Sequence, residues 1–407
     1  MADSVVIVGA AMTPFGPQPS ESVRSLAERA VREALADAEL GVDDVDLVVF
    51  ANASGGLYDG QEMIRGQVAL RHSGLLGKPI LNVENACASS SSALHVGVMA
   101  VRSGAASTVL VVGAEKLAQP AKIRTLAMLG GAVDLAQHAE VRRLIDAYVL
   151  GGMMAPEDAA QVVVDASPFM AMYAERTRAY QARSGATAAD IAAVSVKNRR
   201  HASLNPLAQF RDPVTLEQVL AARPIAPPLT LLMCSPIADG AAALVIRPAD
   251  ERVAAPVVRI RACELRSGGP AGSGPSAVER AAIAAYETAA VVPQDLDVME
   301  VHDAAASAEL WCVEELGLTT DGVAWHADGH TRLGGSHPVN SSGGLLAKGH
   351  PVGATGCAQV VELVDQLRGR AGRRQVAGAR LALAENGGGL IDGREAAAVV
   401  TILEGTT

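Results

Sequence analysis

Residues 340–356 read Asn-Ser-Ser-Gly-Gly-Leu-Leu-Ala-Lys-Gly-His-Pro-Val-Gly-Ala-Thr-Gly, and a helical pattern follows them over residues 355–367. The glycines allow the backbone to pass tightly, and Pro351 fixes the geometry beside His350. A phosphate-binding loop is the obvious alternative, but the spacing matches neither G-x-x-x-x-G-K-[ST] nor a G-x-G-x-x-G that opens the first helix. The stretch therefore predicts a rigidly held histidine just before a helix.

On both sides of this stretch, short apolar runs alternate with helical patterns, which predicts an α/β protein. Strand–helix order occurs in an N-terminal half (residues 1–117 with 235–250) and again in a C-terminal half (residues 251–407). Residues 118–234 are charged and irregular, so we expect an inserted region of helices and loops. The strands that we expect cover residues 5–8, 46–50, 80–83, 108–112, 241–246, 257–262, 297–301, 380–384 and 397–403.

Composition excludes several classes of protein. The 407 residues carry a net charge of −10 and are 49% hydrophobic, with no cluster of five or more basic residues. An acidic chain of this kind argues against a nucleic-acid surface, and no apolar run reaches the length of a membrane span. The N-terminus lacks the features of a signal peptide. Five scattered cysteines without a C-x-x-C pair fit a reducing cytoplasm and indicate neither disulfides nor a metal site in this chain.

A first candidate for chemistry is Cys87, which lies between an expected strand and an amphipathic helix. Unpaired backbone N–H groups at a helix N-terminus favour a thiolate and can hold the oxyanion of a tetrahedral intermediate. Small neighbours in Asn-Ala-Cys-Ala-Ser-Ser leave room for an acyl group. The alternative is a buried cysteine that fills a gap in the core.

Two further candidates follow strands of the C-terminal half. His302, in Glu-Val-His-Asp-Ala-Ala, should lie at the carboxyl edge of the sheet, where a neutral imidazole can donate to a carbonyl or move a proton. Its alternative is a helix cap, for which Asp303 is the more natural residue. The segment from Glu385 to Gly389 reads Glu-Asn-Gly-Gly-Gly, which brings backbone N–H groups close to a ligand or forms a plain turn.

In this order, the four segments resemble the thiolase superfamily, and above all the sterol carrier protein-type thiolases and their bacterial acetyl-CoA acetyltransferase-like relatives. The Gly-Gly-Leu-x-Ala-x-Gly-His-Pro-x-Gly-Ala-Thr-Gly segment is the most specific match. The resemblance implies two βαβαβαββ halves in a five-layered αβαβα core with an inserted loop domain. It also implies a homodimer or a dimer of dimers.

The same resemblance implies the roles of the site residues. Cys87 would be acylated, His350 would activate it, and His302 would hold the thioester oxygen or transfer a proton. A turn at Asn386 to Gly388 would line an oxyanion hole together with the Cys87 N–H. Coenzyme A thioesters would be the substrates, with no permanently bound cofactor.

The sequence departs from the family pattern at one important point. Thiolases use a second cysteine as acid/base, either in a C-x-G turn or in His-Asp-Cys-Phe, but here these positions read Glu385-Asn386-Gly387-Gly388 and His302-Asp303-Ala304-Ala305. The remaining cysteine and two histidines are similar to the set of β-ketoacyl synthases. Glu385 is a candidate replacement base, and a surface or ion-paired glutamate is the alternative.

The sequence therefore predicts a thiolase-like acyltransferase that makes or cleaves a C–C bond through acyl-Cys87. Two alternatives stay open: a thiolase-like retro-aldol lyase, and a catalytically silent scaffold subunit that binds acyl-CoA. Because some relatives without the second cysteine work with a small zinc-ribbon/OB-fold subunit, such a partner is a further expectation, with the zinc in the partner.

Overall fold

The computed structural model describes residues 4–118, 122–139, 141, 168–249, 257–270, 272 and 274–406. In this part of the chain, the main sheet has nine strands in the order β3-β2-β4-β7-β1-β8-β11-β10-β9. The strands are β1 (Val5–Met12), β2 (Leu47–Ala51), β3 (Ile80–Val83), β4 (Val109–Glu115), β7 (Gly240–Pro248), β8 (Val258–Ser267), β9 (Val298–Glu300), β10 (Leu381–Ile391) and β11 (Arg394–Gly405). A separate hairpin pairs β5 (Pro224–Ala226) with β6 (Leu229–Thr230).

The helices follow the predicted alternation. They are α1 (Val23–Asp37), α2 (Gly55–Asp59), α3 (Arg65–Ala69), α4 (Ser89–Arg102), α5 (Lys122–Gly130), α8 (Pro168–Ser184), α9 (Ala188–Ala202), α10 (Leu216–Leu220), α11 (Ala277–Ala289), α12 (Ala306–Glu315), α13 (Gly322–Ala327), α14 (Gly344–Lys348) and α15 (Thr355–Leu367). Capping boxes begin several of them: Ser22 accepts from the N–H of Ser25 before α1, and Ser276 from that of Glu279 before α11.

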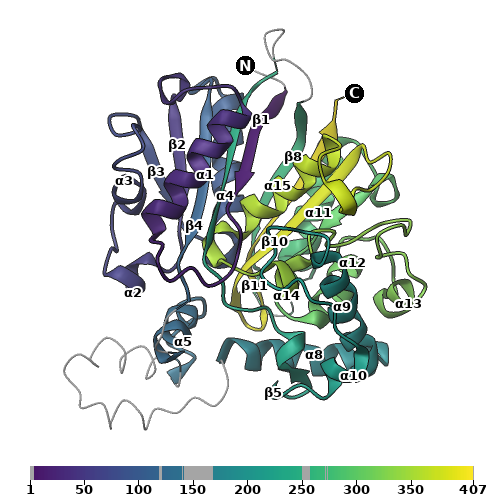
Figure 1. Cartoon of the computed structure of the whole chain (residues 1–407). Helices are drawn as coiled ribbons and strands as arrows, with labels where there is room; N and C mark the ends of the chain where they lie inside the picture. Colours follow the sequence, from purple (N-terminus) through teal and green to yellow (C-terminus); the bar gives the residue numbers. More distant parts are fainter. Residues whose placement is uncertain are drawn as a thin grey trace, which may run out of the picture.

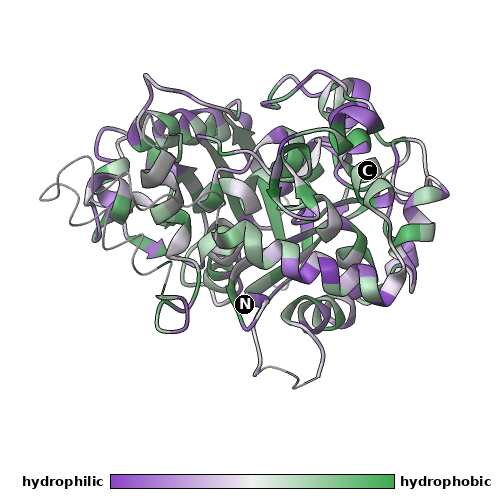
Figure 2. Ribbon diagram, turned by 90° about the horizontal axis from the view of Figure 1, so that it is seen from below, coloured by the Kyte–Doolittle hydropathy of each residue, from purple (hydrophilic) through white to green (hydrophobic). Residues whose placement is uncertain are grey.

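Three apolar clusters lie between the layers of the fold and pack them together. One cluster packs α1 on the outer face of the N-terminal strands, and another packs α11 and α12 on the outer face of the C-terminal strands. A third cluster holds α4 and α15 between the two groups of strands, so the order of layers is α-β-α-β-α, as predicted. The antiparallel pair β1–β8 joins the two halves (Figure 1). Apolar residues gather in the central strands, and polar residues follow the outer helices (Figure 2).

The inserted region places α8, α9 and α10 beside the C-terminal half. Helix α8 packs Phe169, Tyr173 and Tyr180 into the same cluster as Trp311 of α12. Part of the predicted insertion, residues 119–121, 140 and 142–167, lies outside the described residues. In the described residues, no helix has the length and apolar character needed to cross a bilayer.

One local prediction was wrong. We expected a strand to end near Ala384 and the Glu385–Gly389 segment to form a turn, but β10 continues through this segment to Ile391. Its residues stay in register with β11, from Glu385 opposite Val400 to Gly388 opposite Ala397. The strand continues because the antiparallel ladder pairs its backbone groups, so the glycines act through their small size within a strand.

Candidate active site

Cys87 lies in a single 3-10 turn, Ala86–Ala88, directly before α4. The preceding residue, Ala86, has a φ of 48°, in the left-handed region that non-glycine residues rarely adopt. Side chains hold the turn in place, because Glu84 accepts from the Ala86 N–H at 2.6 Å and Ser89 accepts from the Asn85 N–H at 3.0 Å. The turn thus carries Cys87 at the N-terminus of a helix, as the sequence predicts.

His350 contacts this cysteine directly, with its Nε2 at 3.3 Å from the Cys87 Sγ. On the other side of the ring, Nδ1 lies 2.8 Å from the hydroxyl oxygen of Thr355, and this hydroxyl donates to the carbonyl of Pro351. The Thr355 oxygen therefore accepts from Nδ1–H, which leaves a lone pair on Nε2. His350 is set up to receive the thiol proton of Cys87.

His302 approaches the same sulfur from the end of β9. Its ring lies edge-on to that of His350, with the centroids 5.2 Å apart, and ligand atoms of Cys87, His302 and His350 all lie within 4.8 Å of one another. The side-chain amide of Asn386 donates to the His302 Nδ1 at 2.9 Å, and the amide oxygen accepts from Ser91. This network leaves the proton of His302 on Nε2, where it can be donated to an oxygen.

Burial controls the charges of these three groups. It raises the pKa of Cys87 to about 12, with the carboxylate of Glu115 adding to the rise. Burial also lowers the pKa of His302 to about 4, and that of His350 well below its usual range. The expected resting thiolate is therefore wrong, because loss of solvent outweighs the helix N-terminus. The site rests as a neutral thiol beside two neutral imidazoles.

Two backbone N–H groups oppose this effect of burial at the sulfur. Those of Gly389 and of Cys87 itself both lower the pKa of the thiol. Gly388, predicted to line the oxyanion hole, instead allows a close approach of β10 to the cysteine turn: a Cβ there would lie 2.2 Å from the carbonyl oxygen of Asn85. The sequence analysis did not identify Gly389 as the residue whose N–H points at the sulfur. Three adjacent glycines in the sequence do not show which of them takes that position.

Glu385 lies behind His302 and does not line the cavity that contains Cys87. Its Oε2 accepts from the backbone N–H of His302 at 2.8 Å and from the thiol of Cys312 at 3.6 Å. Burial raises its pKa to about 7. Asp303 does not cap its own helix and accepts instead from the N–H of Leu345 at the start of α14.

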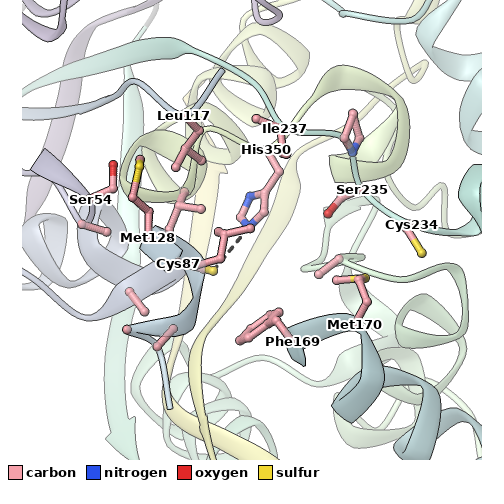
Figure 3. Close-up of a pocket in the computed structure, with 18 of the residues that line it drawn as sticks. Ser54, Cys87, Leu117, Met128, Phe169, Met170, Cys234, Ser235, Ile237 and His350 are labelled. Carbon is pink, nitrogen blue, oxygen red and sulfur yellow. Dashed lines mark hydrogen bonds between the residues drawn. The ribbon is translucent and has the colours of Figure 1, made fainter. Parts of the chain in front are cut away.

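A cavity of about 400 Å³ opens in front of the cysteine. Cys87 and His350 meet on one side of it, with Met128 and Leu117 near them and Phe169 and Met170 opposite (Figure 3). Most of the lining is apolar. Charged side chains also line it, including Glu62 and Arg223, which are exposed and so mark its solvent end. The cavity suits an apolar group that reaches the sulfur from a charged entrance.

Glu115 is a second residue that the sequence did not reveal. Its buried carboxylate accepts from the backbone N–H of Gly353, in the Gly-His-Pro loop, and from that of Ala53, just after β2. It therefore ties the loop that carries His350 to the N-terminal half. No local sequence signal identifies it, because it is the last residue of an ordinary buried strand.

Solved structures with this fold include an Ltp2-ChsH2(DUF35) aldolase, with a TM-score of 0.77 and 24% identity over 98% of both chains. Human mitochondrial 3-ketoacyl-CoA thiolase in complex with CoA has a TM-score of 0.71 and 22% identity, covering 99% of this chain and 98% of that one. At these identities, the likeness shows the fold alone.

Relatives found by sequence share a higher identity with this chain than these solved structures do. An acetyl-CoA acetyltransferase of Methanothermobacter thermautotrophicus is 38% identical over 95% of this chain and 96% of its own length. Human sterol carrier protein 2 is 34% identical over 94% of this chain and 69% of its own length. The benzoylsuccinyl-CoA thiolase subunit BbsB of Thauera aromatica is 34% identical over 77% of both.

Two family domains account for most of the chain. The thiolase N-terminal domain matches residues 5–250, and the thiolase C-terminal domain-like family matches residues 272–404. The residues around Cys87 fall in the first match, and both histidines fall in the second. From these two matches and the relatives above, the chain belongs to the thiolase family.

Proposed function

We propose that this protein is an acyltransferase that works on acyl-CoA thioesters through an acyl group carried on Cys87. The proposal is carried by the 3.3 Å contact between the Cys87 Sγ and a His350 nitrogen whose lone pair is free to take the proton. A thiol is a weak nucleophile until a base removes its proton, and an imidazole at this distance supplies that base.

In the first step, the sulfur of Cys87 attacks the thioester carbonyl while its proton passes to the Nε2 of His350. The oxyanion that forms accepts from the N–H groups of Cys87 and Gly389. When the carbon–sulfur bond to coenzyme A breaks, the His350 proton leaves with the CoA thiol. Proton transfer and oxyanion stabilisation of this kind each contribute about 10²–10⁴-fold to a rate.

In the second step, a nucleophile takes the acyl group from Cys87. The Nε2–H of His302 polarises the carbonyl oxygen of the second thioester, with Asn386 holding the ring in the required tautomer. In a Claisen-type condensation, the α-carbon of the second thioester loses a proton to the Nε2 of His350 and attacks the acyl carbonyl; a C–C bond forms, and the Cys87 sulfur leaves and takes up that proton. Thiolysis runs the other way: Cys87 attacks the 3-oxo carbon of a 3-oxoacyl-CoA, the C–C bond breaks while the released enolate takes the proton from His350, and the sulfur of CoA then takes the acyl group from Cys87. Ala304 lines the cavity where sterol carrier protein-type thiolases carry their second cysteine, so this chain has no sulfur there to act as acid/base.

The entrance of the cavity fits the phosphates of coenzyme A. Arg223 lines it and is exposed, and a guanidinium group binds phosphate oxygens through two hydrogen bonds at once. The 400 Å³ interior leaves room for a pantetheine arm and a small acyl group. We assign no permanent cofactor and no resident metal to this chain.

Assembly and location complete the proposal. Strand β3 is an edge of the main sheet and exposes Leu81, which fits pairing with a second copy in a homodimer or a dimer of dimers. Because one relative is named a thiolase subunit and one similar structure pairs with a DUF35 chain, a small partner subunit is part of the proposal. The five free cysteines suit a reducing cytoplasm.

A retro-aldol lyase, which needs no acyl-enzyme, is the alternative to an acyltransferase. Two observations favour it: one similar structure is named an aldolase, and the second cysteine of thiolases is missing here. Intact-mass spectrometry after mixing with acetyl-CoA separates the possibilities, with Cys87→Ser as the control and EDTA in a parallel sample. We expect a mass increase of one acetyl group, lost in Cys87→Ser and unaffected by EDTA. Cleavage of a substrate without an adduct would favour the lyase, and tight CoA binding without either would favour a scaffold subunit.

A further inference from the structure

The cysteine and the two histidines of the active site also form a group that can hold a metal ion. Among the residues that the structure describes, Cys87, His302 and His350 are the one group of three whose thiol, imidazole or carboxylate atoms are close enough to share an ion. One atom from each lies within 4.8 Å of the other two, and all three side chains are buried. No spacing in the sequence indicates this group, because the cysteine and the histidines lie far apart in the chain.

The distances suit a small cation with tetrahedral geometry. Zinc binds thiolate sulfur at about 2.3 Å and imidazole nitrogen at about 2.0–2.1 Å, so neighbouring ligand atoms around it lie about 3.5 Å apart. The Cys87 Sγ and the His350 Nε2 are 3.3 Å apart, close to this value. From the 4.8 Å limit, the His302 nitrogen has to approach by at most about 1.3 Å, which a rotation of its side chain provides. The acyl cavity, which Cys87 and His350 line, lets the ion and a water ligand enter.

Hydrogen bonds already hold His350 in the form that a metal needs. The Thr355 oxygen accepts from the Nδ1–H of His350, so the lone pair of Nε2 faces the Cys87 sulfur. Histidines that bind metals ordinarily donate their second N–H to an oxygen in this way, which fixes the ring and strengthens the ligand.

The network around His302 supplies the same arrangement when one amide turns over. The Ser91 hydroxyl has one proton and two acceptors, the Oδ1 of Asn386 at 2.7 Å and the carbonyl oxygen of Ala88 at 2.9 Å. With this proton directed to Ala88, the turned amide donates to Ser91 and accepts from the Nδ1–H of His302. The Nε2 of His302 then has a lone pair for a metal.

The charges near the sulfur favour a bound cation. Besides burial, the carboxylates of Glu115 and Glu84 raise the pKa of the Cys87 thiol, because they repel a thiolate. A divalent ion reverses this repulsion, since its charge exceeds that of the thiolate and attracts both carboxylates. The balanced step is Cys87–SH + M²⁺ → Cys87–S–M⁺ + H⁺, in which the S–H bond breaks and the proton leaves to solvent.

We propose that Cys87, His302 and His350 bind a zinc-like divalent ion reversibly and that this ion inhibits acyl transfer. Thiolate and imidazole ligands select zinc, cobalt or cadmium over magnesium and calcium, which prefer oxygen ligands. The ion occupies the sulfur that attacks the thioester and the nitrogen that receives its proton, so metal and acyl group exclude each other. The binding of metal stands independently, whereas its effect as an inhibitor rests on the proposed function.

Titration with Co²⁺ tests the ligand set. Thiolate-bound cobalt gives a charge-transfer band in the near ultraviolet, and tetrahedral cobalt gives strong visible bands. We expect the full chain, freed of metal by dialysis against a chelator, to show both, saturating at one ion per chain and disappearing when Zn²⁺ displaces the cobalt. A chain without these bands would overturn the inference.

Variants identify the cysteine that binds. Cys87→Ser should lose the near-ultraviolet band, and His350→Asn should weaken Co²⁺ binding by more than about tenfold. Cys234→Ser is the matched control, because Cys234 also lines the cavity, and this variant should keep the wild-type bands. A near-ultraviolet band that survives Cys87→Ser, or that disappears in Cys234→Ser, would exclude the proposed ligands.

The inhibition is measured as the rate of Cys87 acylation by acetyl-CoA. Saturating Zn²⁺ should lower this rate at least about 10²-fold, because the base is occupied, and excess EDTA should restore it. An unchanged rate in saturating Zn²⁺ would overturn the inhibition. Cobalt bands without acylation of the metal-free chain would remove the proposed function and leave the metal site, whereas normal acylation without cobalt bands would remove the metal site alone.

Discussion

At the scale of single residues, the neutral resting state of Cys87 decides how the site must work. A thiol with a pKa near 12 is stable and unreactive until its proton has somewhere to go. His350, whose own pKa is depressed by burial, holds this proton only while the oxyanion forms. In the proposed reaction, the pair therefore acts by proton transfer during attack.

His350→Asn tests this coupling. It removes the base and should slow acylation of Cys87 by about 10²–10⁴-fold, measured by rapid-quench mass spectrometry. Thr355→Val is the graded control, because it removes only the acceptor of the Nδ1 proton and should cost about tenfold. Equal effects of the two variants would argue that His350 has a structural role alone.

At the scale of elements, the two halves approach each other closely where β10 passes the cysteine turn. Gly388 allows it, since an added Cβ would also lie 2.7 Å from the N atom of Ala88. One strand thus positions the Gly389 N–H at the sulfur and the Asn386 amide at the His302 ring.

Gly388→Ala should therefore displace the cysteine turn. We expect a loss of about 1–3 kcal/mol in the free energy of unfolding from overpacking, and loss of most acylation activity. Gly41→Ala is the matched control. The φ of Gly41 is −101°, and a Cβ added there would lie 3.7 Å from its nearest neighbour, the Oδ2 of Asp44, so the free energy of unfolding should change by less than about 0.5 kcal/mol. Chemical denaturation of both variants provides the comparison, and equal stabilities would contradict the crowding argument.

The limits of sequence interpretation are visible in the same elements. Alternating strands and helices predicted an α/β protein, because local pattern specifies these elements. The five layers and a histidine beside Cys87 were implied only by the resemblance to the thiolase superfamily. The continuation of β10 was not predicted, since glycines that signal a turn also permit a crowded strand. The raised pKa of the Cys87 thiol was not predicted either, because it arises from burial among Leu117, Met128 and Val352, which lie far from Cys87 in sequence.

At the scale of the whole molecule, the edge strand β3 is exposed, and we propose that a second copy of the chain packs against it. Leu81 on this strand is 47% exposed, and Met63 and Ile64, just before the neighbouring α3, are 77% and 58% exposed. A bare strand edge with apolar side chains invites association.

We expect light scattering after size exclusion to give at least twice the chain mass of 41.7 kDa. Leu81→Arg should shift the population toward monomer. Ile283→Arg, a change at an equally exposed position on α11, should leave the assembly unchanged. A wild-type monomer, or an oligomer that is indifferent to Leu81→Arg, would contradict this assignment of the interface.

Peptide mapping of the acyl group most directly tests the central claim. The protein is mixed with acetyl-CoA, quenched in acid and digested, and the acetylated cysteine is located by tandem mass spectrometry. We predict acetyl on the peptide containing Cys87, released CoA in equal amount, and none on the other four cysteines. An acetyl group on a different residue, or CoA released without a modified peptide, would contradict the account.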